Sequence, residues 1–511
     1  MSMKEKYETL GLPDLKAIAK ARGLKGVSTL KKDEIIDLML KADEADISAG
    51  VDITPKSITS DKPSEGKEDK RSKAPDSRAE GRAEGRSDQR AEGRSAEGRT
   101  SDGKTSEGRS AGRTDTSSDE KARNEVYDAT NFPEELDSGV AASGILEVMP
   151  DGYGFIRCEN FLPGENDVYV APSQIRRFGL KTGDILVGNT RIKKETEKFA
   201  ALLYIKTING YTPEESAKRY NFEDMTPIFP DERIKLERPG CSVAMRIMDL
   251  ISPVGKGQRG MIVSPPKAGK TTLLKEVAKS VKMNNPNTHL IILLIDERPE
   301  EVTDIKEAIE GPNVEVIYST FDELPEHHKR VSEMVIERGR RLVEHKQDVM
   351  ILIDSITRLT RAYNLTVAPS GRTLSGGLDP AALHMPKRFF GAARNMREGG
   401  SLTILATALV ETGSKMDDVV YEEFKGTGNM ELVLDRKLSE KRVFPAIDIP
   451  KSGTRREDLL LSEDELEAIN IIRKAMNGLK PEEAVDHILD MFSRTKNNME
   501  FVNMVKKTKW I

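Results

Sequence analysis

The chain has 511 residues, enough for about three folded units, and a low hydrophobic content of 37% stands beside a charged content of 32%. Its formal charge of −5 excludes a general electrostatic coating of nucleic acid, so any such contact must come from local patches. The two distant cysteines, Cys158 and Cys241, exclude a disulfide-stapled secreted domain and a cysteine-based zinc site, and without any apolar run near the ~18 residues of a membrane span we expect a cytoplasmic protein.

Residues 1–47 are predicted to form a small helical domain. Apolar residues recur at helical spacing within 12–19 and again within 35–40, and a turn containing glycine and serine joins the two runs. A helical hairpin of this length has a small core, so we expect marginal stability.

Residues 48–135 are predicted to be a disordered, charged insertion rich in Arg, Gly, Glu and Ser. No Ile, Leu, Val, Met, Phe, Tyr or Trp occurs between Ser60 and Glu125, and the tripeptide EGR recurs through the tract. Such a segment has no apolar surface to offset its ordering entropy. Two interpretations stay open: a solvated spacer, or a tract that adds weak RNA affinity or drives condensation.

Residues 136–215 are predicted to form a small Greek-key barrel of the OB or cold-shock type, because short alternating strands are separated by glycine-rich turns. Tyr153, Phe155 and Arg157 stand at i, i+2 and i+4 of one strand and therefore project from the same face. Aromatic rings beside a guanidinium form a stacking platform for single-stranded bases, which Tyr169 and Phe199 could extend. The alternative is that these rings fill the core of the barrel.

Residues 216–511 alternate apolar strands with amphipathic helices, the pattern of a parallel α/β sheet, and end in helices. SEDE at 462–465 is a capping box, and Pro481 stands at the favoured first position of another helix. The chain as a whole is thus predicted to be multidomain, with α+β and α/β parts.

The strongest local signal is MIVSPPKAGKTTLL at 261–274, in which an apolar strand runs through a turn into a helix. The pattern G-x-x-x-x-G-K-[ST] binds nucleotide phosphates through loop N–H groups, although here its first position is serine. Lys270 is expected to reach the β- and γ-phosphates and Thr271 to ligate Mg²⁺. The predicted nucleotide-binding residues are Ser264, Pro265, Pro266, Lys267, Ala268, Gly269, Lys270, Thr271 and Thr272.

Two further apolar strands end in acids, at Asp296-Glu297 and at Asp354. An apolar strand followed by Asp is the usual Walker B form, so Asp354 is the expected Mg²⁺-side acid and Glu297 the base that activates water. Taken singly, either acid could simply cap its strand end.

Cationic groups occur in three other regions. Arg442, Arg455 and Arg456 lie in 441–460, where spacing alone does not separate a catalytic arginine from a surface one. The glycine-rich run 368–395 and the segment 412–418 contain two cationic loops with ordinary solvated loops as the alternative. Their candidate RNA-binding residues are Arg372, Thr373, Ser375, Gly376, Gly377 and Lys415.

Taken together, these motifs resemble the bacterial transcription termination factor Rho family from about residue 139 to about residue 490. The strings that carry the resemblance are SPPKAGKTT, LLIDERPEEV, ILIDSITRLTRAYN, SGGLDPAALHMPKRFFGAARN, GSKMDD and KRVFPAIDIPKSGTRRE. The resemblance implies a homohexameric ring of RecA-like ATPases that uses ATP and Mg²⁺ to move 5′→3′ along single-stranded RNA. It also implies contact with RNA polymerase and elongation factors, and release of the transcript.

The resemblance also implies residue roles. Arg455 would be a finger that reaches the neighbouring subunit's ATP, with Arg442 close by, and Phe444 would stack on adenine. The cationic loops would be pore loops, and the aromatic platform the primary RNA site. Where the family has Arg-Tyr before the last barrel strand, this chain has Lys198-Phe199, which lose the bidentate fork and the hydroxyl but keep stacking.

Two other functions compete with this one. A rotary ATP-synthase-type subunit also joins a β-barrel to a RecA-like core, but it would have no aromatic face for RNA. A non-catalytic RNA-binding scaffold would depend on the tract at 50–125 rather than on Lys270.

Overall fold

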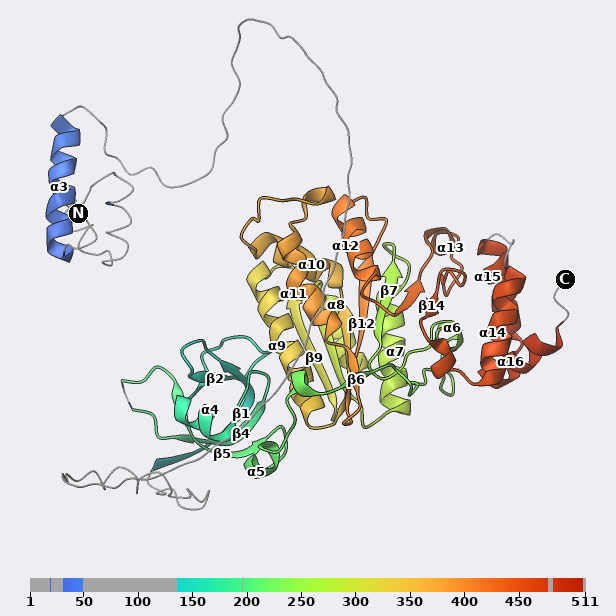
Figure 1. Cartoon of the computed structure of the whole chain (residues 1–511), viewed down its shortest axis with the longest axis horizontal. Helices are drawn as coiled ribbons and strands as arrows, with labels where there is room; N and C mark the ends of the chain where they lie inside the picture. The colour runs from blue at the N-terminus through green and yellow to red at the C-terminus, as the bar shows by residue number, and fades with distance from the viewer. Residues whose placement is uncertain (1–18, 20–30, 49–135, 195, 477–480, 509–511) are drawn as a thin grey trace, which may run out of the picture. The chain divides into compact units, whose positions relative to one another are not determined.

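The computed structural model describes residues 19, 31–48, 136–194, 196–476 and 481–508, and Figure 1 draws them in colour. Two compact units divide the chain, Met1–Gly112 and Arg113–Ile511. In the first, α3 (Lys32–Ser48) buries Ile35, Ile36 and Met39, which confirms the helix expected for the second apolar run. Apart from Ala19, the first predicted helix lies outside the described residues, as does the predicted disordered tract from residue 49 to 135.

In the second unit, five strands close into a barrel in the order β1-β2-β3-β5-β4, which confirms the predicted fold. The strands are β1 (Asp137–Val148), β2 (Gly154–Arg157), β3 (Val168–Val170), β4 (Ile185–Arg191) and β5 (Ala200–Ile208). A short helix, α4 (Pro172–Phe178), joins β3 to β4. Alternate strand residues such as Ile156, Val168 and Val170 fill the interior, so their neighbours point outward.

The α/β part is built on a sheet with the main order β14-β13-β7-β12-β10-β8-β9. Its parallel strands are β7 (Arg259–Ser264), β8 (His289–Glu297), β9 (Val314–Thr320), β10 (Asp348–Asp354), β12 (Ser401–Leu409) and β13 (Met430–Val433). Three short strands pair antiparallel, namely β6 (Pro227–Ile228), β11 (Arg394–Met396) and β14 (Gly453–Thr454). β14 pairs with β13, and β11 pairs with β12 and with β6. Parallel order brings the carboxyl ends of β7, β10 and β8 to one edge, where ligands of such sheets bind.

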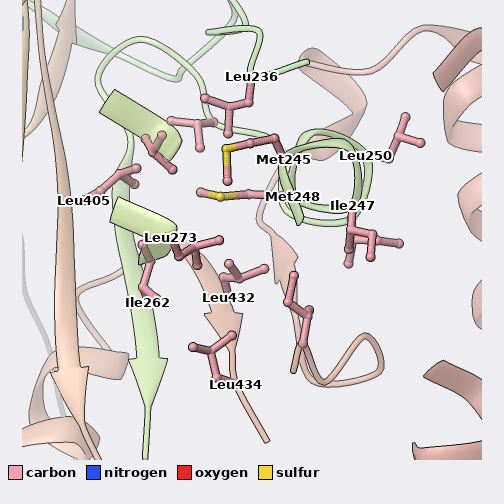
Figure 2. Close-up of a cluster of buried hydrophobic side chains, with 14 of the residues drawn as sticks. Leu236, Met245, Ile247, Met248, Leu250, Ile262, Leu273, Leu405, Leu432 and Leu434 are labelled. Atoms are coloured by element: carbon pink, nitrogen blue, oxygen red, sulfur yellow. The ribbon is translucent and has the colours of Figure 1, made fainter. Parts of the chain in front are cut away.

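Helices cover both faces of this sheet, as continuous apolar strands require. On β8, Leu290, Ile292 and Leu294 join one core cluster, whereas Ile291 and Leu293 join the other. The first cluster takes in helices between residues 243 and 309 and the C-terminal helices, and Figure 2 shows Met245 and Met248 beside Ile262 and Leu432 of the sheet. The second takes in helices between residues 325 and 425, which lie on the other side of the sheet in Figure 1.

The helices of the α/β part vary from short turns to the 20 residues of α9. Before and around the phosphate loop they are α5 (Pro213–Ser216), η3 (Phe222–Asp224), α6 (Val243–Ile251), α7 (Lys270–Asn284) and α8 (Pro299–Ala308). Further along the chain come α9 (Pro325–Glu344), α10 (Ile356–Thr366), η4 (Ser375–Gly377), η5 (Pro380–Leu383), α11 (His384–Gly391), α12 (Lys415–Lys425), α13 (Arg436–Glu440) and η6 (Glu457–Leu459).

Three helices end the chain: α14 (Glu463–Met476), α15 (Pro481–Ser493) and α16 (Asn498–Lys507). The predicted capping box is present, because the Ser462 N–H donates to Glu465 Oε2 at 2.9 Å and the Glu465 N–H donates to Ser462 Oγ at 3.4 Å. Pro481 opens α15 as expected. The buried guanidinium of Arg246 donates to carbonyls at the end of α15, including Phe492 O at 3.0 Å, where a cation complements the helix dipole.

Candidate nucleotide and RNA sites

The turn between β7 and α7 has the geometry of a phosphate cradle. β7 ends at Ser264 and α7 begins at Lys270, so the free N–H groups of the helix N-terminus open onto the turn. Gly269 has a φ of 95°, a left-handed conformation that favours glycine. The nine residues that the sequence assigned to nucleotide binding therefore form the end of β7, one loop and the first turn of α7.

Two acids from different strands meet at the ammonium group of Lys270. The carboxylate of Asp354, at the end of β10, is fully buried and accepts hydrogen bonds from Lys270 Nζ at 2.7 and 2.8 Å. Glu297 Oε2, at the end of β8, lies 3.4 Å from the same nitrogen. The structure thus brings together three residues that the sequence assigned to three separate motifs.

Sequence reasoning missed two residues of this site, Thr407 and Glu301. Thr407 Oγ1 donates to Asp354 Oδ1 at 2.8 Å, and Glu301 Oε2 accepts a hydrogen bond from Thr271 Oγ1 at 3.2 Å. Thr407 is a fully buried hydroxyl in the apolar strand β12, and no local pattern in the sequence points to its partner.

Hydroxyl and carboxylate oxygens are the donors that Mg²⁺ prefers, so Thr271 and Asp354 fit this ion. Among the described residues no group of three or more His, Cys, Asp or Glu side chains could hold a metal.

Burial and charge set the protonation of the two central groups. Burial raises the pKa of Glu297 above its ordinary value; Lys270 lowers it, whereas the negative charges of Asp354 and Glu301 raise it further. Burial lowers the pKa of Lys270, but the two carboxylates outweigh that effect and hold it above its ordinary value. Lys270 therefore stays charged, while Glu297 has the raised pKa of a candidate general base.

A cavity of about 790 Å³ opens beside the phosphate loop. Its walls include Lys267 and Gly269 of that loop, and also Leu434 and the ring of Phe444, which is 51% exposed. An exposed aromatic ring at the rim of a cavity that reaches the phosphate loop suits a stacked base.

The structure places Arg455 in another part of the same unit. Arg455 is exposed and lines cavities of about 540 and 310 Å³ together with Asn429 and Arg456, and neither cavity includes a residue of the phosphate loop. Arg442 is also exposed, with a φ of 62°, two residues before Phe444.

The aromatic residues of the barrel form a continuous cluster outside its core. The ring centroid of Phe155 lies 5.8 Å from that of Tyr153, 6.0 Å from that of Tyr169 and 5.1 Å from that of Phe199. All four rings are partly exposed, and none belongs to the buried core of the barrel. The alternative that these aromatic rings fill the core of the barrel is therefore wrong. Lys198 extends the cluster, with its Nζ 5.2 Å from the centroid of Phe199.

Arg157 joins this cluster in a different way from the one expected. Its guanidinium carbon lies 4.8 Å from the centroid of Phe155, as the shared face predicts. However, Arg157 is only 6% exposed, and it forms ion pairs with Glu147 and Asp167. A strand pattern predicts the face on which a side chain lies but not its partners. For this reason the sequence did not predict the ion pairs with Glu147 and Asp167.

The two cationic loops lie against each other. A Cβ atom on Gly376 would lie 2.4 Å from the backbone nitrogen of Met416, next to Lys415 at the start of α12. Ser375 and Gly377 flank that contact in η4, and their neighbours Arg372 and Thr373 are exposed. The structure thus brings together two segments about 40 residues apart.

Three family models match the chain. Residues 6–44 match the Rho termination factor N-terminal domain, and residues 142–214 match the Rho termination factor RNA-binding domain. Residues 244–454 match the nucleotide-binding domain of the ATP synthase alpha/beta family. The last match is common to the rotary alternative, and the RNA-binding match on the barrel decides against it.

Curated relatives align over most of the chain. Transcription termination factor Rho of Pseudomonas aeruginosa is 56% identical over 373 residues, which cover 72% of this chain and 88% of the relative. The Bacillus subtilis protein of the same name is 56% identical, with 71% and 84% covered. That of Aquifex aeolicus is 54% identical, again with 71% and 84% covered.

Proposed function

This chain belongs to the transcription termination factor Rho family, and from that premise we propose how its residues divide the work of an RNA-dependent ATPase that terminates transcription. One observation carries the proposal: Lys270 contacts both Glu297 and Asp354 at the phosphate loop, next to the cavity that Phe444 lines.

When ATP binds, Lys270 leaves the Asp354 carboxylate and pairs with the β- and γ-phosphates. One ammonium group cannot remain fully paired with the carboxylate and the phosphates at once. Thr271 and the freed carboxylate of Asp354 would then hold Mg²⁺, which neutralises phosphate charge. Glu297 accepts a proton from the attacking water, and Phe444 stacks on the base. Thr407 keeps the Asp354 carboxylate oriented throughout.

The position of Arg455 supports a ring. Arg455 lines cavities that contain no phosphate-loop residue, and this separation supports a role on the ATP of a neighbouring copy. We therefore assign Arg455 as a finger in trans in a homohexamer, with Arg442 as a second catalytic arginine. Binding by identical patches of several copies gives avidity to a protein whose formal charge is −5.

RNA is proposed to use two surfaces. Tyr153, Phe155, Arg157 and Tyr169, extended by Lys198 and Phe199, hold single-stranded RNA on the barrel by stacking. The paired loops that contain Arg372, Gly376 and Lys415 grip RNA inside the ring. ATP turnover then moves RNA 5′→3′ through the ring and releases it from RNA polymerase.

A mixing experiment tests this division of work. Lys270→Ala and Arg455→Ala variants should each lose ATPase activity, but a mixture that has exchanged subunits should regain part of it. Activity returns because some interfaces combine an intact Lys270 with an intact Arg455. If Arg455 acts within its own chain, or not at all on ATP, the mixture stays as inactive as its components.

A further inference from the structure

Glu147, on the side of the barrel that carries the aromatic cluster, is one of the residues that link the barrel to the ATPase core. Glu147 lies on β1 opposite Phe155 of β2, so both side chains share a face of the barrel. Arg157 Nε donates to Glu147 Oε2 at 2.7 Å. Arg330, from α9 of the core, donates through one terminal nitrogen to both carboxylate oxygens, each at 2.7 Å. A barrel arginine and a core arginine therefore share one carboxylate.

The charges of this group balance only when Arg330 is counted. Asp167 is the second carboxylate, paired with Arg157 and only 2% exposed. With Arg330 the group holds two guanidinium and two carboxylate groups. Without it, one negative charge is in excess directly beside the aromatic cluster, where it would repel a phosphate backbone.

The geometry of the cluster depends on the same contacts. The guanidinium of Arg157 stands 4.8 Å from the centroid of Phe155, which in turn contacts the other three aromatic rings. The side chain of Glu147 is 16% exposed, so removing one of its partners leaves a largely desolvated carboxylate to be satisfied by Arg157 alone.

We propose that Arg330 of the ATPase core completes the RNA site of the barrel by neutralising the charge of Glu147 beside the aromatic cluster. This inference rests on the proposed function, because it requires RNA to bind the aromatic cluster. Arg330 is a positioning residue, and RNA affinity on the barrel then depends on the barrel remaining docked to α9. α9 is itself tied to α10, since Tyr363 Oη donates to Glu333 Oε1 at 2.9 Å.

Charge rescue in the full-length protein tests the proposal. Arg330→Met should weaken the binding of a fluorescent single-stranded RNA by roughly tenfold, the loss of one charge-assisted contact. Adding Glu147→Gln to that variant should restore most of the affinity, because the excess negative charge is gone. Arg388→Met is the matched control: Arg388 lines the same cavity of about 770 Å³ as Arg330 and Glu147, and its loss should leave RNA affinity unchanged.

Other outcomes overturn the idea in distinguishable ways. A purely structural role for Arg330 predicts that the double variant binds RNA as weakly as Arg330→Met, because the contact stays broken. RNA affinity unaffected by Arg330→Met would also refute it. Tyr153→Ala with Phe155→Ala separates the two proposals: if this variant binds RNA normally, the RNA site itself is misplaced. ATP affinity without RNA should stay normal in every variant, which reports an intact fold.

Discussion

At the residue scale, the chemistry of this protein depends on where two buried acids sit relative to one lysine. Asp354 takes both short hydrogen bonds of Lys270 and that of Thr407, whereas Glu297 lies at the longer distance of 3.4 Å. The two acids are therefore not equivalent. Asp354 is fixed by hydrogen bonds from Lys270 and Thr407 and is oriented to bind a cation. Glu297 has the longer contact with Lys270 and a raised pKa.

Glu297→Gln should retain ATP binding and lose turnover by about 100-fold or more, because an amide of the same shape cannot accept the proton of water. Equilibrium binding of a fluorescent ATP analogue and steady-state ATP hydrolysis measure the two effects. Glu300→Gln, an exposed neighbour in α8, is the control and should leave both unchanged. Substantial turnover in Glu297→Gln would assign the base to another residue.

The pH profile gives a second test at this scale. Burial raises the pKa of Glu297, so the acidic limb of the ATPase profile should lie above the range of an exposed glutamate. The positive charge of Arg358 lowers that pKa, so Arg358→Met should move the limb to still higher pH. A limb that stays in place or moves to lower pH would show that another group controls it.

At the scale of elements, the sequence predicts what lies close in the chain better than what lies close in space. The phosphate loop, the capping box at Ser462 and the aromatic positions Tyr153 and Phe155 follow from local spacing, and the structure has all of them where expected. The hydrogen bond of Thr407 to Asp354 joins two strands 53 residues apart, and Arg330 reaches Glu147 across 183 residues. Neither spacing carries a local signal, which is why these partners could not be predicted.

The contact between the two cationic loops is an element-scale feature that can be tested with matched glycines. Gly376 and Gly371 both have positive φ, of 79° and 78°, but only Gly376 has backbone of the other loop within 4 Å. Gly376→Ala should therefore reduce RNA-stimulated ATP hydrolysis by roughly tenfold, since a backbone contact of 2.4 Å forces the loops apart. Gly371→Ala shares the backbone strain but not the clash, and should have a much smaller effect. Equal effects in both variants would attribute the loss to strain alone.

At the scale of the whole molecule, a barrel with an aromatic face and a nucleotide-binding sheet are joined by apolar and polar contacts. Ile145 and Phe161 of the barrel belong to a buried cluster of the core. Lys181 of the barrel pairs with Glu344 of α9 at 3.1 Å, and the Asn160 side chain donates to Tyr318 O of β9 at 2.6 Å. These contacts, with that of Arg330, give the barrel several anchors on the core. None of the helices in the described part of the chain could span a lipid bilayer.

The nucleotide site proposed for this chain hydrolyses ATP mainly when the protein holds RNA. The most direct measurement is steady-state ATP hydrolysis by the full-length protein, with and without single-stranded RNA, beside a variant that lacks residues 50–125. We expect hydrolysis to rise at least about tenfold with RNA in both proteins, and Lys270→Ala to abolish it. An ATPase rate that is the same whether or not RNA is present would contradict the account.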